Sequence, residues 1–163
     1  EFVQFCDAFS IPVLSITNVN GFKNCMCSEK KLAKALARMT YAFSNATCAK
    51  VNMITGEAYG SAYVFMNSKS IGADLVYAWN DAKIGTMDST MAAKIMYPDA
   101  DAAEIKEKAS EYEKLQSSAT SAAARGYVDR IIEPADSRKY LVAAFEMLYT
   151  KYVGEPEKKH GTK

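Results

Sequence analysis

The 163-residue sequence is poor in the residues from which metal centres are built. It contains a single histidine, His160, and four cysteines, of which only Cys25 and Cys27 lie close together in sequence. A structural zinc site normally takes four cysteine or histidine ligands, so we predict no metal site and interpret the cysteines as free thiols. Free thiols are typical of a reducing compartment, and a metal held by the Cys25–Cys27 pair is the weaker alternative.

Long apolar runs and an excess of one charge are also missing. No apolar run approaches the roughly 20 residues that span a bilayer, so no transmembrane helix is predicted. The chain carries 20 basic and 19 acidic residues, a balance that gives no electrostatic reason to expect a nucleic-acid partner. Hydrophobic residues make up 49% and charged residues 24%, which is typical of a globular protein.

The length suits one domain with a substantial core. We predict a single domain over residues 1–153 and a charged, flexible tail over 154–163. The chain opens on Glu1 instead of Met, and its first residues already resemble the last turns of an amphipathic helix. We therefore expect the sequence to be a piece of a longer chain.

Strand-like and helix-like patterns alternate along the chain. Helices are predicted over 2–9, 28–44, 91–96, 101–117 and 137–152, and strands over 11–17 (buried), 49–55, 74–79, 83–86 and 126–132. The small, polar residues 117–126 are predicted to form a surface loop or a frayed helix end. The alternation favours an α/β fold with helices crossing between strands. No G-x-G-x-x-G follows the first strand, so a dinucleotide-binding fold is not supported.

The stretch TGEAYGSAYVFMNSKSIGADLVYAW, from Thr55 to Trp79, stands at the centre of this pattern. It predicts a strand, a turn of small residues that includes Gly60 and Ala62, a short helix and a second strand. A strand that turns into a helix with few side chains in the way presents unpaired N–H groups, which can bind a developing oxyanion. Small residues also allow a helix to pack closely on a sheet, and the turn by itself favours this structural interpretation.

Three ordered blocks resemble one known family. FCDAFSIPVLSITNVNGF is similar to F-C-D-A-F-x-I-P followed by a hydrophobic run and D-x-P-G-F, and the central stretch resembles T-R-K-A-Y-G-G-A-Y-x-x-M-x-S-K-x-x-G-A-D-x-x-x-A-W. RGYVDRIIEPADSRKYL resembles R-G-Y-[IV]-D-x-I-I-x-P-x-x-T-R. These are motifs of the C-terminal half of the carboxyltransferase subunit of biotin-dependent acyl-CoA carboxylases and decarboxylases. The resemblance implies a crotonase-like α/β fold, a spiral of short strands with flanking helices.

The resemblance also implies an activity, the movement of CO₂ between carboxybiotin and an acyl-CoA. The backbone N–H groups of Ser61 and Ala62 match the pair that stabilises the biotin ureido oxygen. The implied cofactor-binding residues are Gly21, Phe22, Tyr59, Gly60, Tyr63 and Val64. Val64 stands where the family often has Asp or a hydrophobe that tunes acyl size.

The implied cofactor is biotin on a carrier protein, the implied substrate is a coenzyme A thioester, and no metal is expected in this domain. The implied partners are a biotin carboxyl carrier protein, an N-terminal carboxyltransferase domain and further copies of the same subunit. Because the oxyanion hole for the thioester belongs to that N-terminal half, we expect the 163-residue piece alone to be inactive. The expected location is the cytoplasm, either free or peripheral to a membrane complex.

Departures from the family pattern leave alternatives open. Asn18 and Asn20 replace the acid and the proline of D-x-P-G-F, and Ser61 replaces a glycine. One alternative is therefore a non-catalytic, crotonase-like assembly domain, and another is the carboxyltransferase subunit of a decarboxylase that drives a sodium pump. A third alternative is a hydratase or isomerase in which Glu57 acts as the general base.

Overall fold

The computed structural model describes residues 1–23 and 25–154, except for the side chain of Cys27. The predicted tail after Gly154 lies outside the described residues. The helices are α1 Phe2–Ala8, α2 Met26–Asn45, α3 Gly60–Val64, α4 Ser89–Met96, α5 Ala102–Tyr112, α6 Ala119–Ala124 and α7 Ser137–Met147. The strands are β1 Val13–Val19, β2 Lys50–Tyr59, β3 Leu75–Trp79, β4 Lys83–Gly85 and β5 Arg130–Ile132. Short 3₁₀ turns cover Lys69–Ile71 and Pro134–Asp136, and a π-helical turn covers Glu113–Ser117.

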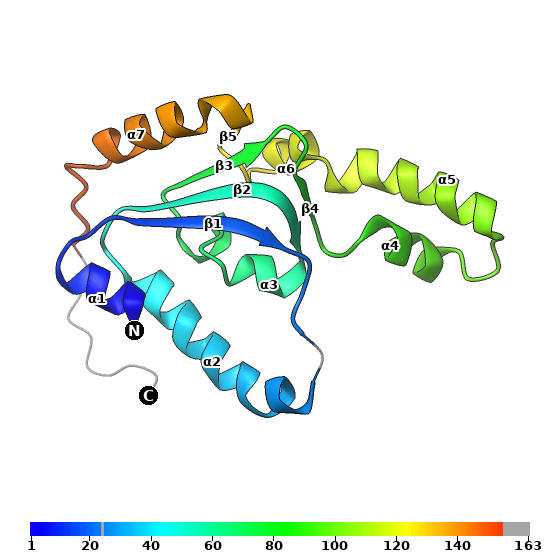
Figure 1. Ribbon diagram of the computed structural model, residues 1–163, viewed down its shortest axis with the longest axis horizontal. Coiled ribbons are helices and arrows are strands. Elements are labelled where there is room, and N and C mark those ends of the chain that lie inside the picture. The colour runs from blue at the N-terminus through cyan, green and yellow to red at the C-terminus, as the bar shows by residue number, and fades with distance from the viewer. Residues whose placement is uncertain (24, 155–163) are drawn as a thin grey trace.

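The strands form a parallel sheet that winds around β2. In the described chain the order is β1-β2-β3-β5, and the first half of β2 pairs with β3. The last residues of β2, Glu57–Tyr59, pair with β4 instead. β2 curves visibly between these two partners (Figure 1). The α/β fold and the spiral of short strands with flanking helices are therefore confirmed.

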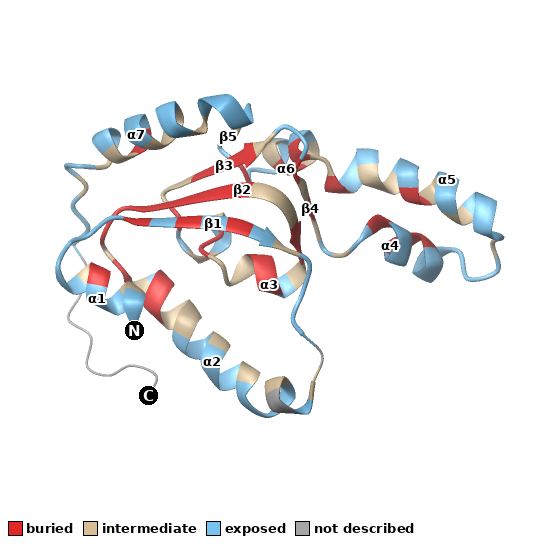
Figure 2. Cartoon of the chain, viewed as in Figure 1, coloured by how far each residue is buried: buried red, intermediate tan, exposed pale blue. Residues whose placement is uncertain are grey.

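The two faces of the sheet bury different helices. Side chains alternate along a strand, so Val51 and Met53 point to one face, where they pack near Ala144 of α7. Ile54 points to the other face and joins a core with Val76. Figure 2 shows the central strands as the most continuously buried part of the molecule, with the helices exposing their outer sides. The core thus lies on both faces of β2, as expected for a parallel sheet.

β1 differs from the prediction because it lies at the edge of the sheet. The segment 11–17 is predicted to be a buried strand, but the strand runs from Val13 to Val19 and only every second side chain is buried. Leu14 and Ile16 remain 39% and 58% exposed. The apolar run predicted the strand correctly, but it could not show that the strand pairs on one side only.

The segment 117–126 also differs from the prediction. It forms α6, which begins after Ser118, whose hydroxyl accepts a hydrogen bond from the N–H of Ser121. Ala119 and Ala122 are each 2% exposed and belong to the core that contains Ile54. The prediction of a surface loop or a frayed helix end was wrong because small, weakly hydrophobic alanines were not recognised as core residues.

α4 and α5 form an arm that projects from the body of the molecule (Figure 1). Asp88 and Asp101 cap the two helices, since each carboxylate accepts hydrogen bonds from two backbone N–H groups of the first turn. The two helices contact one another, and Ala93 of α4 and Ala109 of α5 are buried. The arm is therefore held by capping and by the contact between the helices.

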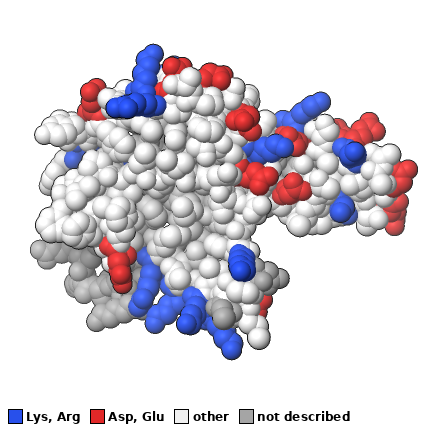
Figure 3. Space-filling view, viewed as in Figure 1, with Lys and Arg blue, Asp and Glu red and all other residues white. Residues whose placement is uncertain are grey.

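α2 carries a cluster of basic side chains on its outer surface. Lys30, Lys31, Lys34 and Arg38 are exposed, and they contribute to the basic region at the lower edge of Figure 3. Only its C-terminal part is firmly anchored, through buried Phe43 near α1. With this density of charge α2 does not qualify as a membrane span, and no other helix in the described part of the chain does.

Candidate functional site

The site begins where β2 turns directly into α3. Tyr59 is the last strand residue, and Gly60 has a φ of +63°, in the left-handed region that favours glycine. A Cβ atom on Gly60 would lie 3.1 Å from the carbonyl oxygen of Thr86. The strand ends four residues later than predicted, so the sharp turn is confined to Tyr59 and Gly60. Glycine is needed here both for the backbone conformation and for the close approach of Thr86, which directly follows β4.

α3 places two amide groups at its open end. Ser61 and Ala62 lie in the first turn of the helix, where backbone N–H groups have no acceptor within the helix. No residue that the structure describes accepts a hydrogen bond from either amide. Ser61 is exposed, whereas Ala62 is buried. Neither N–H group is therefore bonded to an acceptor in the described part of the chain.

A cavity of about 460 Å³ lies beside this turn. It is enclosed by α3, the end of β4, the π-helical turn and α6. Its lining residues are Gly60, Ser61, Tyr63, Val64, Ser70, Ile84, Gly85, Thr86, Tyr112, Gln116, Ala122, Arg125 and Tyr127. The volume lies in the range of small-molecule sites, which is roughly 300–1,000 Å³.

The structure brings together half of the residues expected at the site. Gly60, Ser61, Tyr63 and Val64 line the cavity. Tyr59 and Ala62 adjoin it in sequence, but they are not among its lining residues.

Gly21 and Phe22 lie in the loop after β1, and neither of them lines the cavity. Gly21 is exposed with nothing within 4 Å of the place of its Cβ, and Phe22 is 39% exposed. The expected contact of this loop with biotin therefore stays a prediction.

Sequence reasoning missed the wall of the cavity that α6 and the residues just after it provide. Ala122 lines this wall from α6, and Arg125 and Tyr127 line it from the segment that follows the helix. Both residues stand in the R-G-Y-V-D block that carried the resemblance, so a signal was present. It was not used because the adjoining segment was interpreted as a loop, which would have carried both side chains away from α3.

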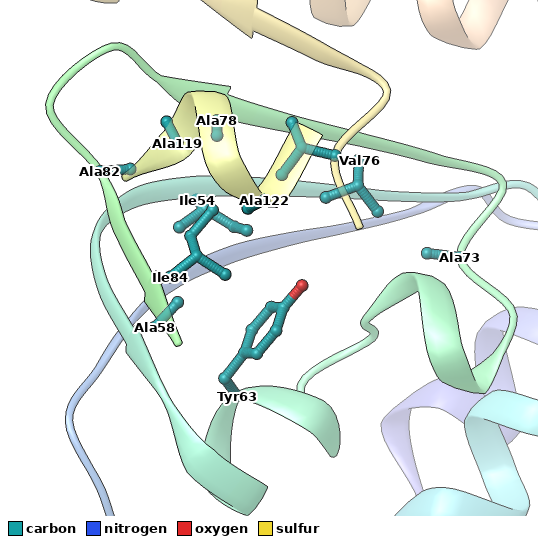
Figure 4. Packing of buried hydrophobic residues seen from close by; sticks show 11 residues of the cluster. Ile54, Ala58, Tyr63, Ala73, Val76, Ala78, Ala82, Ile84, Ala119 and Ala122 are labelled. Atoms are coloured by element: carbon teal, nitrogen blue, oxygen red, sulfur yellow. The ribbon is translucent and has the colours of Figure 1, made fainter. Parts of the chain in front are cut away.

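Tyr63 lies at the inner end of the cavity. Its ring rises from α3 toward the buried cluster that includes Ile84 and Ala122 (Figure 4), and the residue is only 7% exposed. Its hydroxyl is buried and has no hydrogen-bond partner among the described residues. Burial, and secondarily the neighbouring Tyr127, raises the pKa of Tyr63 to about 12. The hydroxyl is therefore protonated at neutral pH and can donate a hydrogen bond.

The arrangement gives little support to acid–base chemistry by a side chain. Glu57 lies on β2, where its backbone N–H donates to Oδ1 of Asn18 over 3.0 Å, and it does not line the cavity. No aspartate or glutamate occurs among the lining residues of the described chain. Among the same described residues, no cluster of histidine, cysteine or acidic side chains suits a metal ion.

A second polar cluster lies at the opposite end of β2, where the strand begins. One Asp7 carboxylate oxygen accepts from the N–H groups of Thr47 and Cys48 at 2.7 and 3.1 Å. Asp74 accepts from the N–H of Lys50 at 2.7 Å and pairs with the Lys151 ammonium at 2.9 Å. Here each of these amides is bonded to a carboxylate of the same chain.

Burial governs the ionisation of this second cluster. The side chain of Lys50 is buried and donates to the carbonyl oxygen of Phe43 at 2.6 Å. Desolvation, and then the nearby Lys151 charge, lowers the pKa of Lys50. Burial and the adjacent Asp7 raise the pKa of the Cys48 thiol. A thiol in this state is a weak nucleophile, so the cluster is best understood as structural.

Known proteins match the chain over almost its whole length. A family model described as "Carboxyl transferase domain" matches residues 1–162. The putative propionyl-CoA carboxylase beta chain of Bacillus subtilis is 45% identical, over 99% of this chain and 33% of its own. The methylmalonyl-CoA decarboxylase subunit alpha of Propionigenium modestum is 44% identical, over 99% of this chain and 32% of its own. The chain thus spans about a third of the length of the curated relatives it matches.

Solved structures agree in fold. A crystal structure of transcarboxylase 12S, titled as a hexamer assembly with substrate binding to a multienzyme core, matches with a TM-score of 0.92 and 40% identity. The match covers 98% of this chain and 32% of the transcarboxylase chain. The beta subunit of P. aeruginosa geranyl-CoA carboxylase matches with a TM-score of 0.77 at 23% identity, over 96% of this chain and 32% of its own, which supports the fold alone. The fold is therefore crotonase-like, as predicted.

Proposed function

The chain belongs to the carboxyl transferase domain family, and from this premise we propose that it forms the biotin-side domain of an acyl-CoA carboxyltransferase. The reaction moves CO₂ between carboxybiotin and an acyl-CoA. The observation that carries the proposal is the pair of amides without an acceptor, Ser61 and Ala62, beside a cavity that no described carboxylate lines.

The amides of α3 act as an oxyanion hole for the ureido oxygen. Carboxybiotin, when bound, would supply the CO₂, and the Ser61 and Ala62 amides would hold the ureido oxygen on which negative charge develops. The N–H groups of Ser61 and Ala62 lie at the first turn of a helix and are fixed by the β2–α3 turn, so they need no reorganisation to stabilise this charge. Gly60 allows the turn, and a side chain there would crowd Thr86.

Other residues shape the pocket around the biotin ring. Tyr63 and Val64 line the cavity from α3 and give it an aromatic and an aliphatic wall. Tyr59 holds the strand end from which α3 starts. Gly21 and Phe22 belong to the loop next to the end of β2 and would flank the biotin as it enters, a role that requires the loop to approach the cavity.

The proposal includes partners that supply the rest of the site. Biotin arrives on a carrier protein, and an N-terminal carboxyltransferase domain binds the acyl-CoA and stabilises its thioester oxygen. The subunit acts as a homo-oligomer, and the 163-residue chain alone is inactive because half of the composite site is elsewhere. A cytoplasmic location, free or at the surface of a membrane complex, fits this chemistry.

The direction of the reaction is a separate question. Relatives whose names describe a carboxylase and a decarboxylase are 45% and 44% identical, so identity does not favour either. Release of CO₂ from methylmalonyl-CoA in the presence of biotinylated carrier, coupled to sodium transport, would support the decarboxylase. Formation of methylmalonyl-CoA from propionyl-CoA with carrier charged by ATP would support the carboxylase.

The oxyanion hole is tested by removing one N–H group without changing a side chain. In the complete subunit, Ala62 is replaced by lactic acid, so that the peptide N–H becomes an ester oxygen. The transfer of a labelled carboxyl group from methylmalonyl-CoA to biotinylated carrier is then measured. We expect the rate to fall by roughly 10²–10³-fold, the usual effect of losing one such donor.

A matched control uses the same chemistry at Ala102, the first residue of α5, whose amide also has no described acceptor. This variant should transfer at the unmodified rate. An unchanged rate in the Ala62 variant, with a native circular dichroism spectrum, would reject the oxyanion hole. A complete subunit that assembles with its partners but never transfers CO₂ would support the non-catalytic assembly domain instead.

A further inference from the structure

The outer surface of α2 carries a row of positive charge. Lys30, Lys34 and Arg38 are spaced four residues apart, so they share one face of the helix. All three are exposed, and in the described part of the chain none of them forms an ion pair with a carboxylate. This basic row is therefore not neutralised by any residue that the structure describes.

α5 carries a row of negative charge on its outer surface. Glu104, Glu107 and Glu111 follow one another at intervals of three and four residues, which places them on one face of the helix. All three are exposed, and among them only Glu111 has an ion pair within the described chain, with Lys108 at 3.2 Å. Lys106 lies two residues from Glu104 and therefore off this face. The outer face of α5 thus forms an acidic row.

The two rows lie on separate parts of the molecule. α5 belongs to the arm that projects from the body, whereas the charged part of α2 extends away from the sheet on the other side (Figure 1). Figure 3 shows acidic side chains toward the free end of the arm and basic ones at the lower edge of the body. The basic row and the acidic row of one copy therefore do not meet each other.

The rows match in length as well as in charge. At the usual helical rise, Lys30 to Arg38 covers about 12 Å of α2 and Glu104 to Glu111 about 10 Å of α5. Small, exposed residues flank both rows: Ala33, Ala37, Ala103 and Ser110. Side chains this small allow two helices to approach until the longer charged side chains meet.

We propose that copies of this chain meet head to tail, with the basic row of α2 in one copy against the acidic row of α5 in the next. The inference rests on the proposed function only in taking the subunit to be a homo-oligomer. Each copy offers both rows, so the contact is heterologous and can repeat from copy to copy until a ring closes. A two-fold contact through α2 is disfavoured, because it would set positive charge against positive charge.

Other anionic partners of α2 fit these observations less well. A helix that binds a membrane surface normally buries large apolar side chains beside its lysines, but the exposed residues that flank the basic row are alanines. A separate acidic protein would account for the basic row alone. A contact between copies accounts for both rows and for their equal length.

A charge reversal at the middle of each row tests the contact, whichever way the two helices run. In the complete subunit, Lys34→Glu or Glu107→Lys replaces an attraction between copies by a repulsion. Either change should raise the dissociation constant for self-association by about threefold to tenfold at low salt, as expected for an exposed ion pair. Mass photometry on dilution measures this constant. Salt at about 0.5 M should reduce the difference, because exposed charges are screened.

Recombining the reversed charges separates this contact from a general effect of charge. The variant that carries both changes should recover the wild-type dissociation constant within about twofold. An equal mixture of the two single variants should assemble more tightly than either alone, since the altered α2 of one copy then meets the altered α5 of another. Lys139→Glu, on the exposed surface of α7, is the matched control. It should assemble as the wild type does and should not rescue Glu107→Lys.

The outcomes that would overturn the contact are distinct from those that bear on the reaction. Wild-type affinity in both single variants, with native melting temperatures, would overturn it, as would weakened assembly that neither the double variant nor the mixture rescues. Vesicles of phosphatidylserine and phosphatidylcholine that bind the wild type but not Lys34→Glu, with assembly unchanged, would overturn it in favour of a membrane surface. Rescue in a subunit that never transfers CO₂ would keep the contact and reject the proposed function. Transfer in a subunit without rescue would do the reverse.

Discussion

The backbone amides at the two ends of β2 differ in whether they have a hydrogen-bond acceptor. At the amino end, Asp7 and Asp74 accept hydrogen bonds from the N–H groups of Thr47, Cys48 and Lys50. At the carboxyl end, the amides of the first turn of α3 have no acceptor among the described residues. The amides where β2 begins are thus bonded to carboxylates of the same chain, whereas the amides just after its end have no described acceptor.

The difference indicates which end is built for stability and which for binding. A buried amide without an acceptor costs free energy. Amides that the protein leaves without an acceptor at one end of β2 are therefore expected to bind a ligand. The polar groups of the cavity follow the same rule, since the Tyr63 hydroxyl is also without a partner. Substitutions should therefore lower stability at the amino end and alter ligand binding at the carboxyl end.

The largest expected effect is at Asp74. Asp74→Ala should lower the free energy of unfolding by about 3 kcal/mol, because the Lys151 ammonium and the Lys50 amide lose the same partly buried carboxylate. Urea denaturation at pH 7 measures the change. Asp81→Ala, in the exposed turn after β3, is the matched control and should cost less than about 0.5 kcal/mol. Similar small losses in both variants would remove the contrast between the two ends of the strand.

The second prediction concerns the stability of the protein at alkaline pH, where Tyr63 titrates. Because burial raises the pKa of Tyr63 from 10.0 to about 12, the unfolded chain loses this proton first. The contribution of this pKa shift to the free energy of unfolding is fully present below pH 10. It is lost as the pH rises toward 12, by about 3 kcal/mol in total. Urea unfolding across this range should show a smaller pH-dependent loss in Tyr63→Phe. Tyr149→Phe, which alters an 89% exposed side chain, should follow the wild type.

The third prediction separates backbone strain from crowding at the turn. Gly60 and Gly126 both have positive φ, +63° and +81°, so alanine at either should cost about 1–2 kcal/mol. Only at Gly60 would the new Cβ meet a neighbour, the Thr86 oxygen at 3.1 Å, whereas Gly126 has nothing within 4 Å. Gly60→Ala should therefore be the less stable variant in urea denaturation. Equal losses would mean that the end of β4 moves aside easily.

The smallest effect compares two buried hydroxyl groups at neutral pH. Tyr63→Phe removes an unsatisfied hydroxyl and should raise the free energy of unfolding by about 1 kcal/mol. Thr17→Val should lower it by about 1–2 kcal/mol, because the Thr17 hydroxyl donates to Oδ1 of buried Asn52 at 2.8 Å. Thermal unfolding without ligand measures both. A loss of stability in Tyr63→Phe would show that the hydroxyl already has a partner, such as bound water.

Much of the fold could be predicted because local patterns and tertiary packing agree. The alternation of strands and helices and the β2–α3 turn were both predicted from residue types and spacing. The limits of the elements were less accurate, since helix α7 ends at Met147 and not at residue 152. Helix ends depend on tertiary contacts as well as on local propensity.

Half of the predicted site residues lie together in the structure. Gly60, Ser61, Tyr63 and Val64 line one cavity because they are adjacent in sequence and share one turn, and their binding roles stay predictions. Arg125 was missed because it is about sixty residues away and approaches α3 only when α6 packs into the core. The roles assigned to Gly21 and Phe22 stay predictions.

The sequence by itself determined the order of elements, the crotonase-like family and the amides of the β2–α3 turn, because these depend on residues that are close together along the chain. Only the tertiary structure decided which strand lies at the edge, that α6 belongs to the core, and that Arg125 and Tyr63 line the same cavity. The physical reason is that pairing partners, burial and charge environment are set by segments far apart in sequence. No local pattern of residues encodes them.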